Sequence, residues 1–124
     1  MPTAADVIGV LNSRAAYYGG TASDLIDLTP EVLWDHPQEI LTYWDIKDLS
    51  HVYPQSTNPE LANVWSNIMA EDSDINRARG AEVMTDPEIN EALLDNELDA
   101  IEIDSQLDGD STEFLEELFD ALTP

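Results

Sequence analysis

The chain has 124 residues, enough for one domain with a modest core, and its hydrophobic content of 43% is typical of a folded protein. Its formal net charge of -23, from 27 acids against 4 Lys or Arg residues, excludes the basic surface of a generic nucleic-acid binder. The charge instead favours basic partners or a salty environment, and the absence of cysteine excludes disulfides, thiolate chemistry and cysteine zinc sites.

Two further absences predict where the protein works. No stretch of the sequence approaches the roughly 18 to 20 apolar residues that span a bilayer. The N-terminus also lacks the basic region and following apolar run of a secretory signal. We therefore expect a cytoplasmic protein that is not secreted and does not associate with membranes.

Residues 1–44 are expected to be mainly helical. Thr3 can cap a helix over residues 3–18, where apolar side chains recur at helical spacing, and the glycines that follow end it. A short helix is expected to start at Pro30 and to stop before Pro37, because the residue before a proline disfavours the helical conformation. A second helix then carries apolar side chains as far as residue 44.

We expect different positions for the histidine of this segment and for the tryptophans of the chain. His36, directly before Pro37, is expected to be a surface or capping residue. The tryptophans are expected to be core or interface anchors rather than a platform for stacking bases: Trp34, Trp44 and Trp65.

Residues 45–84 have the pattern strand, loop, strand, helix. The first strand is expected over residues 46–53, and a second short strand over residues 65–69 after a turn-like stretch. A helix is expected over residues 71–81, with acids in its first turn and arginines in its last, the order that suits the helix dipole.

Residues 85–124 carry fourteen acids and no Lys or Arg, and such a segment is usually a solvated surface. A helix is expected from residue 85, a strand over 101–104 where apolar and acidic residues alternate, a turn at 108–110 and a last helix over 111–122. The last helix has an apolar face that either a partner or the domain itself must cover, and both alternatives stay open: Phe114, Leu115, Leu118 and Phe119.

The central segment resembles the ββα-metal finger of the HNH endonuclease family. His51-Val52-Tyr53-Pro54-Gln55-Ser56 is similar to the family's H-I-V-P-Q-S run, as in the HNH domain of RNA-guided CRISPR nucleases. Asn67 is similar to the family's middle asparagine, and the stretch from Asp74 to Gly80 resembles its S-D-K-N-R-G-K ending. The resemblance covers about a third of the chain, and it extends to HNH-like proteins of tailed bacteriophages, which makes a viral source plausible and the host cytoplasm or the virion the expected location.

The resemblance implies a role for each residue of the motif. His51 would be the general base that activates water, and Asn67 would hold the loop that orients it. One Mg²⁺ or Mn²⁺ ion would bind oxygen ligands at Asn76 and at the position before the histidine. Arg77 and Arg79 would contact phosphate, since a guanidinium can bind phosphate oxygens in pairs.

The chain departs from the family at one position. Nucleases of this family usually have Asp-His where this chain has Ser50-His51, and a serine hydroxyl is a poor substitute for a carboxylate ligand. Asp48 lies two residues earlier, on the same face of the strand as Ser50, and can reach the ion directly or through water. The expected metal ligands are therefore Asp48, Ser50 and Asn76.

The expected fold is α+β, either as one compact domain or as a domain with a tail. An N-terminal helical segment (1–44) precedes a small HNH-like ββα finger (45–84), and an acidic segment with a strand and a helix (85–124) follows.

Two functions of different classes follow. The first is a metal-dependent HNH-type endonuclease acting on nucleic-acid phosphodiesters, in an active or a degenerate form. The second is a non-enzymatic acidic phage protein on the same scaffold, with no cofactor. Such a protein would be a DNA mimic that inhibits a basic, DNA-binding protein, or a component of the virion or of its assembly. The oligomeric state is not specified by either function.

Overall fold

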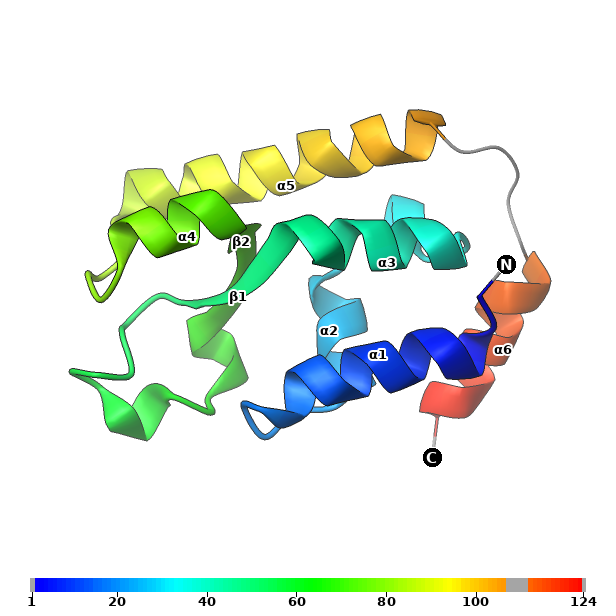
Figure 1. Cartoon of the computed structure of the whole chain (residues 1–124), viewed down its shortest axis with the longest axis horizontal. Helices are drawn as coiled ribbons and strands as arrows, with labels where there is room; N and C mark the ends of the chain where they lie inside the picture. Colours follow the sequence, from blue (N-terminus) through cyan, green and yellow to red (C-terminus); the bar gives the residue numbers. More distant parts are fainter. Residues whose placement is uncertain (1, 107–111, 124) are drawn as a thin grey trace.

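The computed structural model describes residues 2–106 and 112–123, and in these residues the chain is α+β, as the sequence predicts (Figure 1). No helix in this part of the chain is both long and apolar enough to cross a membrane. The elements in chain order are α1 (Ala4–Ala16), α2 (Ala22–Leu28), the 3₁₀ turn η1 (Glu31–Leu33), α3 (Pro37–Ile46), β1 (Lys47–His51), η2 (Pro59–Leu61), η3 (Trp65–Asn67), β2 (Ile68–Asp72), α4 (Ser73–Arg79), α5 (Asp86–Gln106) and α6 (Thr112–Leu122).

The centre of the chain is a two-stranded hairpin followed at once by a helix. β1 and β2 are antiparallel, with Lys47 opposite Asp72 and His51 opposite Ile68. A long connection, residues 52–67, joins them, and α4 begins directly after β2. This is the predicted order of strand, loop, strand and helix, although the second strand begins three residues later than expected.

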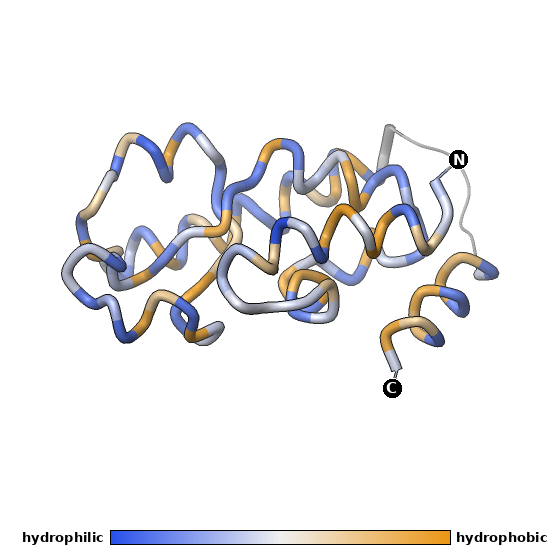
Figure 2. Tube along the Cα trace, turned by 60° about the horizontal axis from the view of Figure 1, so that its bottom comes forward, coloured by the Kyte–Doolittle hydropathy of each residue, from blue (hydrophilic) through white to orange (hydrophobic). Residues whose placement is uncertain are grey.

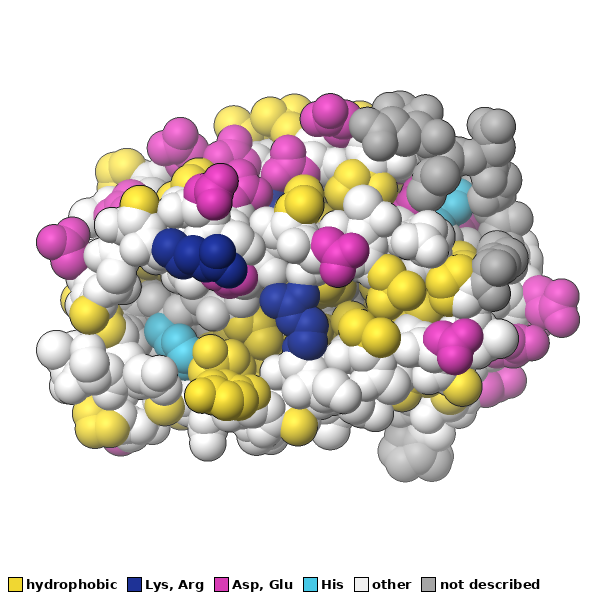
Figure 3. All heavy atoms as spheres, in the orientation of Figure 1, with side chains coloured by type: hydrophobic (Ala, Val, Ile, Leu, Met, Phe, Trp, Pro, Cys, Tyr) yellow, Lys and Arg dark blue, Asp and Glu magenta, His cyan; other side chains and the backbone are white. Residues whose placement is uncertain are grey.

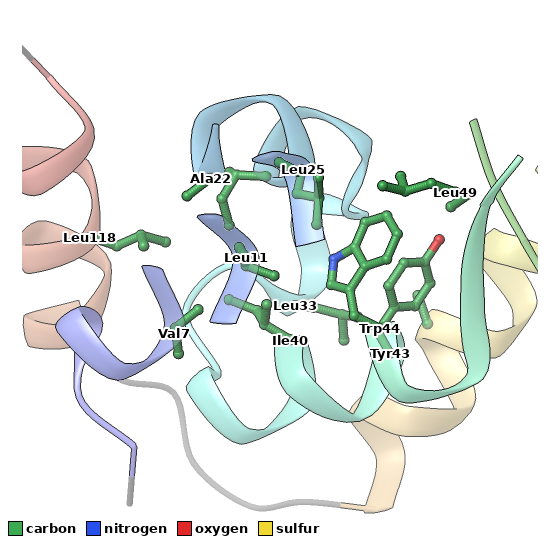
Figure 4. Close-up of a cluster of buried hydrophobic side chains, with 14 of the residues drawn as sticks. Val7, Leu11, Ala22, Leu25, Leu33, Ile40, Tyr43, Trp44, Leu49 and Leu118 are labelled. Atoms are coloured by element: carbon green, nitrogen blue, oxygen red, sulfur yellow. The ribbon is translucent and has the colours of Figure 1, made fainter. Parts of the chain in front are cut away.

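The helices enclose the hairpin and the main core. α3 lies between α1 and α5, and α6 packs against α1 (Figure 1). The core draws on α1, α2, η1, α3, β1, β2, α5 and α6, and Trp44, which is 1% exposed, lies in it (Figure 4). The indole of Trp44 donates to the hydroxyl of Thr29 at 3.0 Å, which gives this buried N–H its partner.

Two features of the N-terminal half differ from the predictions: the helix α2 and the burial of His36. α2 begins after Thr21, whose backbone N–H donates to the carboxylate of Asp24 at 2.8 Å. His36 occupies the position before the first residue of α3, as expected of a capping residue, but its side chain makes no capping bond and is buried rather than on the surface.

The predicted strand at residues 101–104 is wrong, because α5 continues through it. Residues Ala92, Asn96, Ala100 and Ile103 are buried at helical spacing, while Ile101 is 60% exposed. The local alternation of apolar and acidic residues therefore does not mark a strand: Ile103 belongs to the buried face of the helix and Ile101 to its exposed face. The predicted turn Asp108-Gly109-Asp110 lies outside the described residues.

The apolar face of α6 is covered by the domain itself. Leu118 and Phe114 are 0% and 5% exposed in the main core, and Leu115 is partly buried. Phe119 is 39% exposed, and its ring meets that of Trp34 edge-on at 5.6 Å between centroids. The helix next to the C label in Figure 2 accordingly alternates between hydrophobic and hydrophilic residues. Of the two alternatives left open by the sequence, coverage by the domain therefore holds for Phe114 and Leu118, which are not available as a partner-binding face.

Replacing Leu118 with alanine should therefore destabilise the whole domain. We expect the free energy of unfolding to fall by about 2 to 5 kcal/mol, because the substitution leaves a cavity against α1. Urea denaturation measures this loss, and Glu117→Ala on the exposed side of α6 is the matched control. Equal effects of the two substitutions would contradict the docking of α6.

Candidate functional site

Two adjoining hollows lie where the end of α1 faces β1 and α4. The first, of about 390 Å³, includes His51, Arg77 and residues 54–56 in its lining. The second, of about 460 Å³, includes Asp48 and Arg14. Both are lined by Tyr18, Leu49 and Asn76, so the predicted base and the predicted carboxylate ligand open onto one connected surface.

His51, the last residue of β1, is held by one ring nitrogen. Its Nε2 lies 2.9 Å from the carbonyl oxygen of Ala62. Because a carbonyl can only accept, this contact assigns the hydrogen to Nε2, and Nδ1 of the neutral ring is left as an acceptor. The ring of Tyr18 meets the imidazole edge-on at 4.9 Å between centroids, and it fixes the second side of the ring.

Asn67 closes the connection that carries Ala62. Its amide oxygen accepts from the backbone N–H of Tyr53 at 2.8 Å. Its amide nitrogen donates to the carbonyls of Tyr53 at 3.0 Å and Leu61 at 3.3 Å. Asn67 is 5% exposed and therefore acts on the loop rather than on a bound molecule.

The same connection also rests on the turn after α1. The indole ring of Trp65 lies over Gly20, where a Cβ atom would come within 2.2 Å of it. Only glycine permits this close approach without a shift of the ring. The loop behind His51 is thus fixed both by an asparagine and by a flat aromatic contact.

Asp48 and Asn76 meet at the edge of β1. One carboxylate oxygen of Asp48 accepts from the hydroxyl of Ser73 at 2.8 Å, and the other accepts from the amide nitrogen of Asn76 at 3.2 Å. Asp48 remains 24% exposed in its side chain. A carboxylate and an amide oxygen are the hard ligands that Mg²⁺ and Mn²⁺ accept, so the donor set fits such an ion.

Ser50 does not join this pair. Its side chain is buried, with the residue 1% exposed, and its hydroxyl lies 3.3 Å from Nη1 of Arg79 and 3.8 Å from the sulfur of Met84. Ser50 lines neither hollow. We therefore remove it from the expected metal ligands, because its hydroxyl faces the inside of the domain.

The two arginines of α4 have opposite environments. The side chain of Arg79 is 5% exposed, contacts both carboxylate oxygens of Glu71 and donates from Nε to Glu88 at 2.9 Å. These bonds raise the pKa of Arg79, and the bond from Arg79 is the main cause that lowers the pKa of Glu88 to about 2. Arg79 is therefore occupied and is not the phosphate contact that we expected.

Arg77 is the one exposed cation in a chain whose four Lys and Arg residues all lie in the described part. Its side chain is 74% exposed, and its Nε lies 3.7 Å from the carboxylate of Asp48. Lys47 is buried between Asp72 and Asp99, at 2.5 and 2.7 Å. Arg14 donates to the carbonyls of Trp44 and Lys47, the latter at 2.8 Å. On the face drawn in Figure 3 the basic side chains accordingly form two small groups among many acids.

Sequence reasoning missed three residues of this site: Arg14, Tyr18 and Ser73. Arg14 comes from α1 and Tyr18 from the turn after it, both far from the motif in sequence, and nothing in the local pattern indicates that α1 ends beside β1. Ser73 is the residue that follows β2, where a hydroxyl at the start of α4 is a signal that could have been read.

Comparison with known proteins adds no relative. No family model, no curated protein and no solved structure matches the chain.

Removing Arg79 should destabilise the protein far more than removing Arg77. Arg79→Ala leaves Glu71, which is 1% exposed, as a buried charge without its cation, and we expect a loss of about 3 to 5 kcal/mol in the free energy of unfolding. Arg77→Ala should change it by no more than about 0.5 kcal/mol. Urea denaturation of both variants measures the difference. A loss for Arg79→Ala as small as that for Arg77→Ala would show that the buried pair of Arg79 and Glu71 is not essential.

Proposed function

We propose that the protein hydrolyses phosphodiester bonds of nucleic acid with the help of one divalent ion, in the manner of an HNH endonuclease. One observation supports this function above the others. A histidine with one anchored nitrogen opens onto the same connected surface as the carboxylate of Asp48 and the side-chain amide of Asn76 that donates to it. The order of strand, loop, strand and helix around these residues agrees with the likeness of the sequence to that family.

In this function His51 is the general base. Its Nδ1 takes a proton from the attacking water, while Nε2–H stays bonded to the carbonyl of Ala62. That bond also stabilises the charged ring that forms, because the carbonyl dipole points at it. Asn67 and Tyr18 act as positioning residues, since they fix the loop and the ring without touching the reacting atoms.

Asp48 and Asn76 would hold the metal, which would stabilise charge on the phosphate and on the leaving oxygen. Ser73 holds one oxygen of Asp48 in place, which leaves the side chain less freedom to turn away. Asp48 thus takes the part of the carboxylate that the family usually carries directly before the histidine.

Arg77 is the residue placed to contact a phosphate next to the site, because its guanidinium is exposed and close to Asp48. A single exposed cation gives weak attraction to a polyanion, and many acidic side chains lie on the face drawn in Figure 3. Tyr18 adds a neutral hydroxyl to the hollow, since burial raises its pKa. The protein would therefore bind nucleic acid weakly on its own.

The test is cleavage of plasmid DNA in Mg²⁺ and in Mn²⁺. We expect nicking that His51→Gln and His51→Ala both reduce by at least about 100-fold, because a positioned base contributes that much or more. Gln can still donate to the carbonyl of Ala62 but cannot take a proton. Asp48→Asn should also lose activity, whereas Asp45→Asn, an exposed acid three residues earlier, is the matched control.

Two results would overturn this function. One is the absence of cleavage with every divalent ion while circular dichroism shows a folded protein. The other is full activity of His51→Gln, which would mean that the ring nitrogen takes no proton in the reaction.

A second candidate function is favoured by the distribution of charge. Three of the four cations bind groups of the domain itself. Arg77 is the one exposed basic side chain among the described residues, so few surface cations offset the net charge of -23. Such a surface is complementary to a basic, DNA-binding protein, for which it would replace the row of phosphates. In this function the ββα finger is a scaffold and the protein is a DNA mimic or a particle component.

This second function predicts that the protein displaces DNA from a basic DNA-binding protein. Fluorescence anisotropy of labelled DNA measures the displacement, which should weaken as salt rises from about 50 to 200 mM. A variant with Glu113, Glu116 and Glu117 changed to glutamine should displace DNA less well. DNA that stays bound at every concentration of the acidic protein, together with absence of the protein from virus particles, would contradict this function.

A further inference from the structure

A second cluster of ionisable groups lies away from the candidate nuclease site, between the start of α3 and the C-terminal part of α5. It consists of Asp35, His36, Glu39 and Asp104. Nε2 of His36 lies 3.1 Å from a carboxylate oxygen of Asp35 and 3.2 Å from one of Asp104. Nδ1 of the same ring lies 3.7 Å from a carboxylate oxygen of Glu39. Asp35, His36 and Asp104 line a hollow that shares no lining residue with the hollow of His51, so this cluster is separate from the surface around His51.

Glu39 is the member that points to a ligand. The residue is 0% exposed, and neither of its carboxylate oxygens has a hydrogen-bond partner among the described residues. A buried carboxylate without a partner is costly, and it is relieved either by a proton or by a cation. Burial raises the pKa of Glu39 to about 7, with Asp104 and Asp35 adding to the rise and His36 opposing it.

We propose that His36, Glu39 and Asp104 bind a divalent transition-metal ion of the zinc class. One ligand atom from each residue lies within 4.8 Å of the other two. Asp104 has a side chain that is 35% exposed and can turn to close the remaining distance, whereas Glu39 is already fixed in the interior.

The donor set selects the class of ion. A neutral imidazole nitrogen and two carboxylate oxygens suit Zn²⁺ better than Mg²⁺ or Ca²⁺, which prefer oxygen ligands alone. With Nδ1 of His36 as the ligand beside Glu39, the Nε2–H can stay bonded to Asp35. A carboxylate on the second nitrogen is the usual support of a metal-bound histidine, because it fixes the ring and increases its basicity.

The site joins elements that are distant in sequence. His36 and Glu39 stand at the start of α3, and Asp104 is near the end of α5. An ion bound by all three residues ties the two helices together and compensates the buried carboxylate of Glu39. The ion therefore stabilises the fold and is not required by the proposed reaction at His51.

The experiment is a titration of the full chain with Zn²⁺ alone, followed by calorimetry and by the temperature of unfolding. We expect one ion per chain and a higher unfolding temperature with Zn²⁺, and a smaller effect of Mg²⁺. Glu39→Gln keeps the shape of the side chain and should weaken Zn²⁺ binding at least about tenfold. Asp104→Asn, at a partly exposed position, should do the same and serves as a second variant if Glu39→Gln folds poorly.

Three controls separate this site from other sources of binding. Glu91→Gln removes an exposed acid from α5 and should bind Zn²⁺ as the parent does. Asp48→Asn should also retain the ion, so failure of the proposed nuclease function and failure of this site are distinguishable. In NMR spectra Zn²⁺ should shift the imidazole signals of His36 and leave those of His51 unchanged.

Any of three outcomes would overturn the site. The first is no Zn²⁺ binding at concentrations up to about 100 μM, which is well above the dissociation constant that we expect for a three-ligand protein site. The second is equal binding by Glu39→Gln, Asp104→Asn and the parent, which would assign the ion to surface acids. The third is a His36 signal that does not respond to Zn²⁺.

Discussion

The scarcity of cations is the constraint on which the structure depends. Lys47 lies inside the domain and joins β1 to β2 through Asp72 and to α5 through Asp99. Arg79 joins α4 to β2 through Glu71 and to the start of α5 through Glu88. These two residues hold the hairpin, its helix and α5 as one unit in a chain of strong self-repulsion. The same use of cations inside the domain leaves Arg77 as the one exposed basic side chain of the described residues, with Arg14 half-buried, so stability and affinity for polyanions compete for one small set of residues.

The alternation of side chains along β1 explains how the site is divided. Leu49 faces the main core, while Ser50 faces α4 and its buried Arg79, and His51 lies beside Tyr18 and the connection between the strands. Asp48 and Ser50 point toward the same helix, but only Asp48 stands at the open edge, next to Asn76. A carboxylate at position 50 would lie beside Arg79 and Glu71 in the interior. The packing of α4 on this hairpin therefore explains why the exposed carboxylate is that of Asp48 and not of a residue at position 50.

The sequence predicts the centre of the fold better than its surroundings. Local signals were sufficient for the hairpin, for α1, α3 and α4, and for the proximity of Asp48 to Asn76, since each depends on periodicity or on a short motif. They failed at residues 101–104, where the buried spacing of Ala100 and Ile103 decides for a helix. They failed again at His36, because its contact with Asp104 joins two residues that are 68 positions apart. The burial of Arg79 depends on Glu71 and Glu88, which are eight and nine positions away but on other elements, and the local pattern does not show that these elements meet.

The placement of the basic residues also determines how the folded chain meets proteases of the trypsin type. Such enzymes cut only after Lys or Arg, and they need several residues in an extended conformation around the cut. Lys47 is in a strand, Arg14 and Arg79 are engaged by the domain, and Arg77 is exposed but lies in the middle of α4. A cut at any of these points requires local unfolding first. From residue 80 to the end the sequence contains no such point, so the acidic C-terminal third is resistant to these enzymes even when it is unfolded.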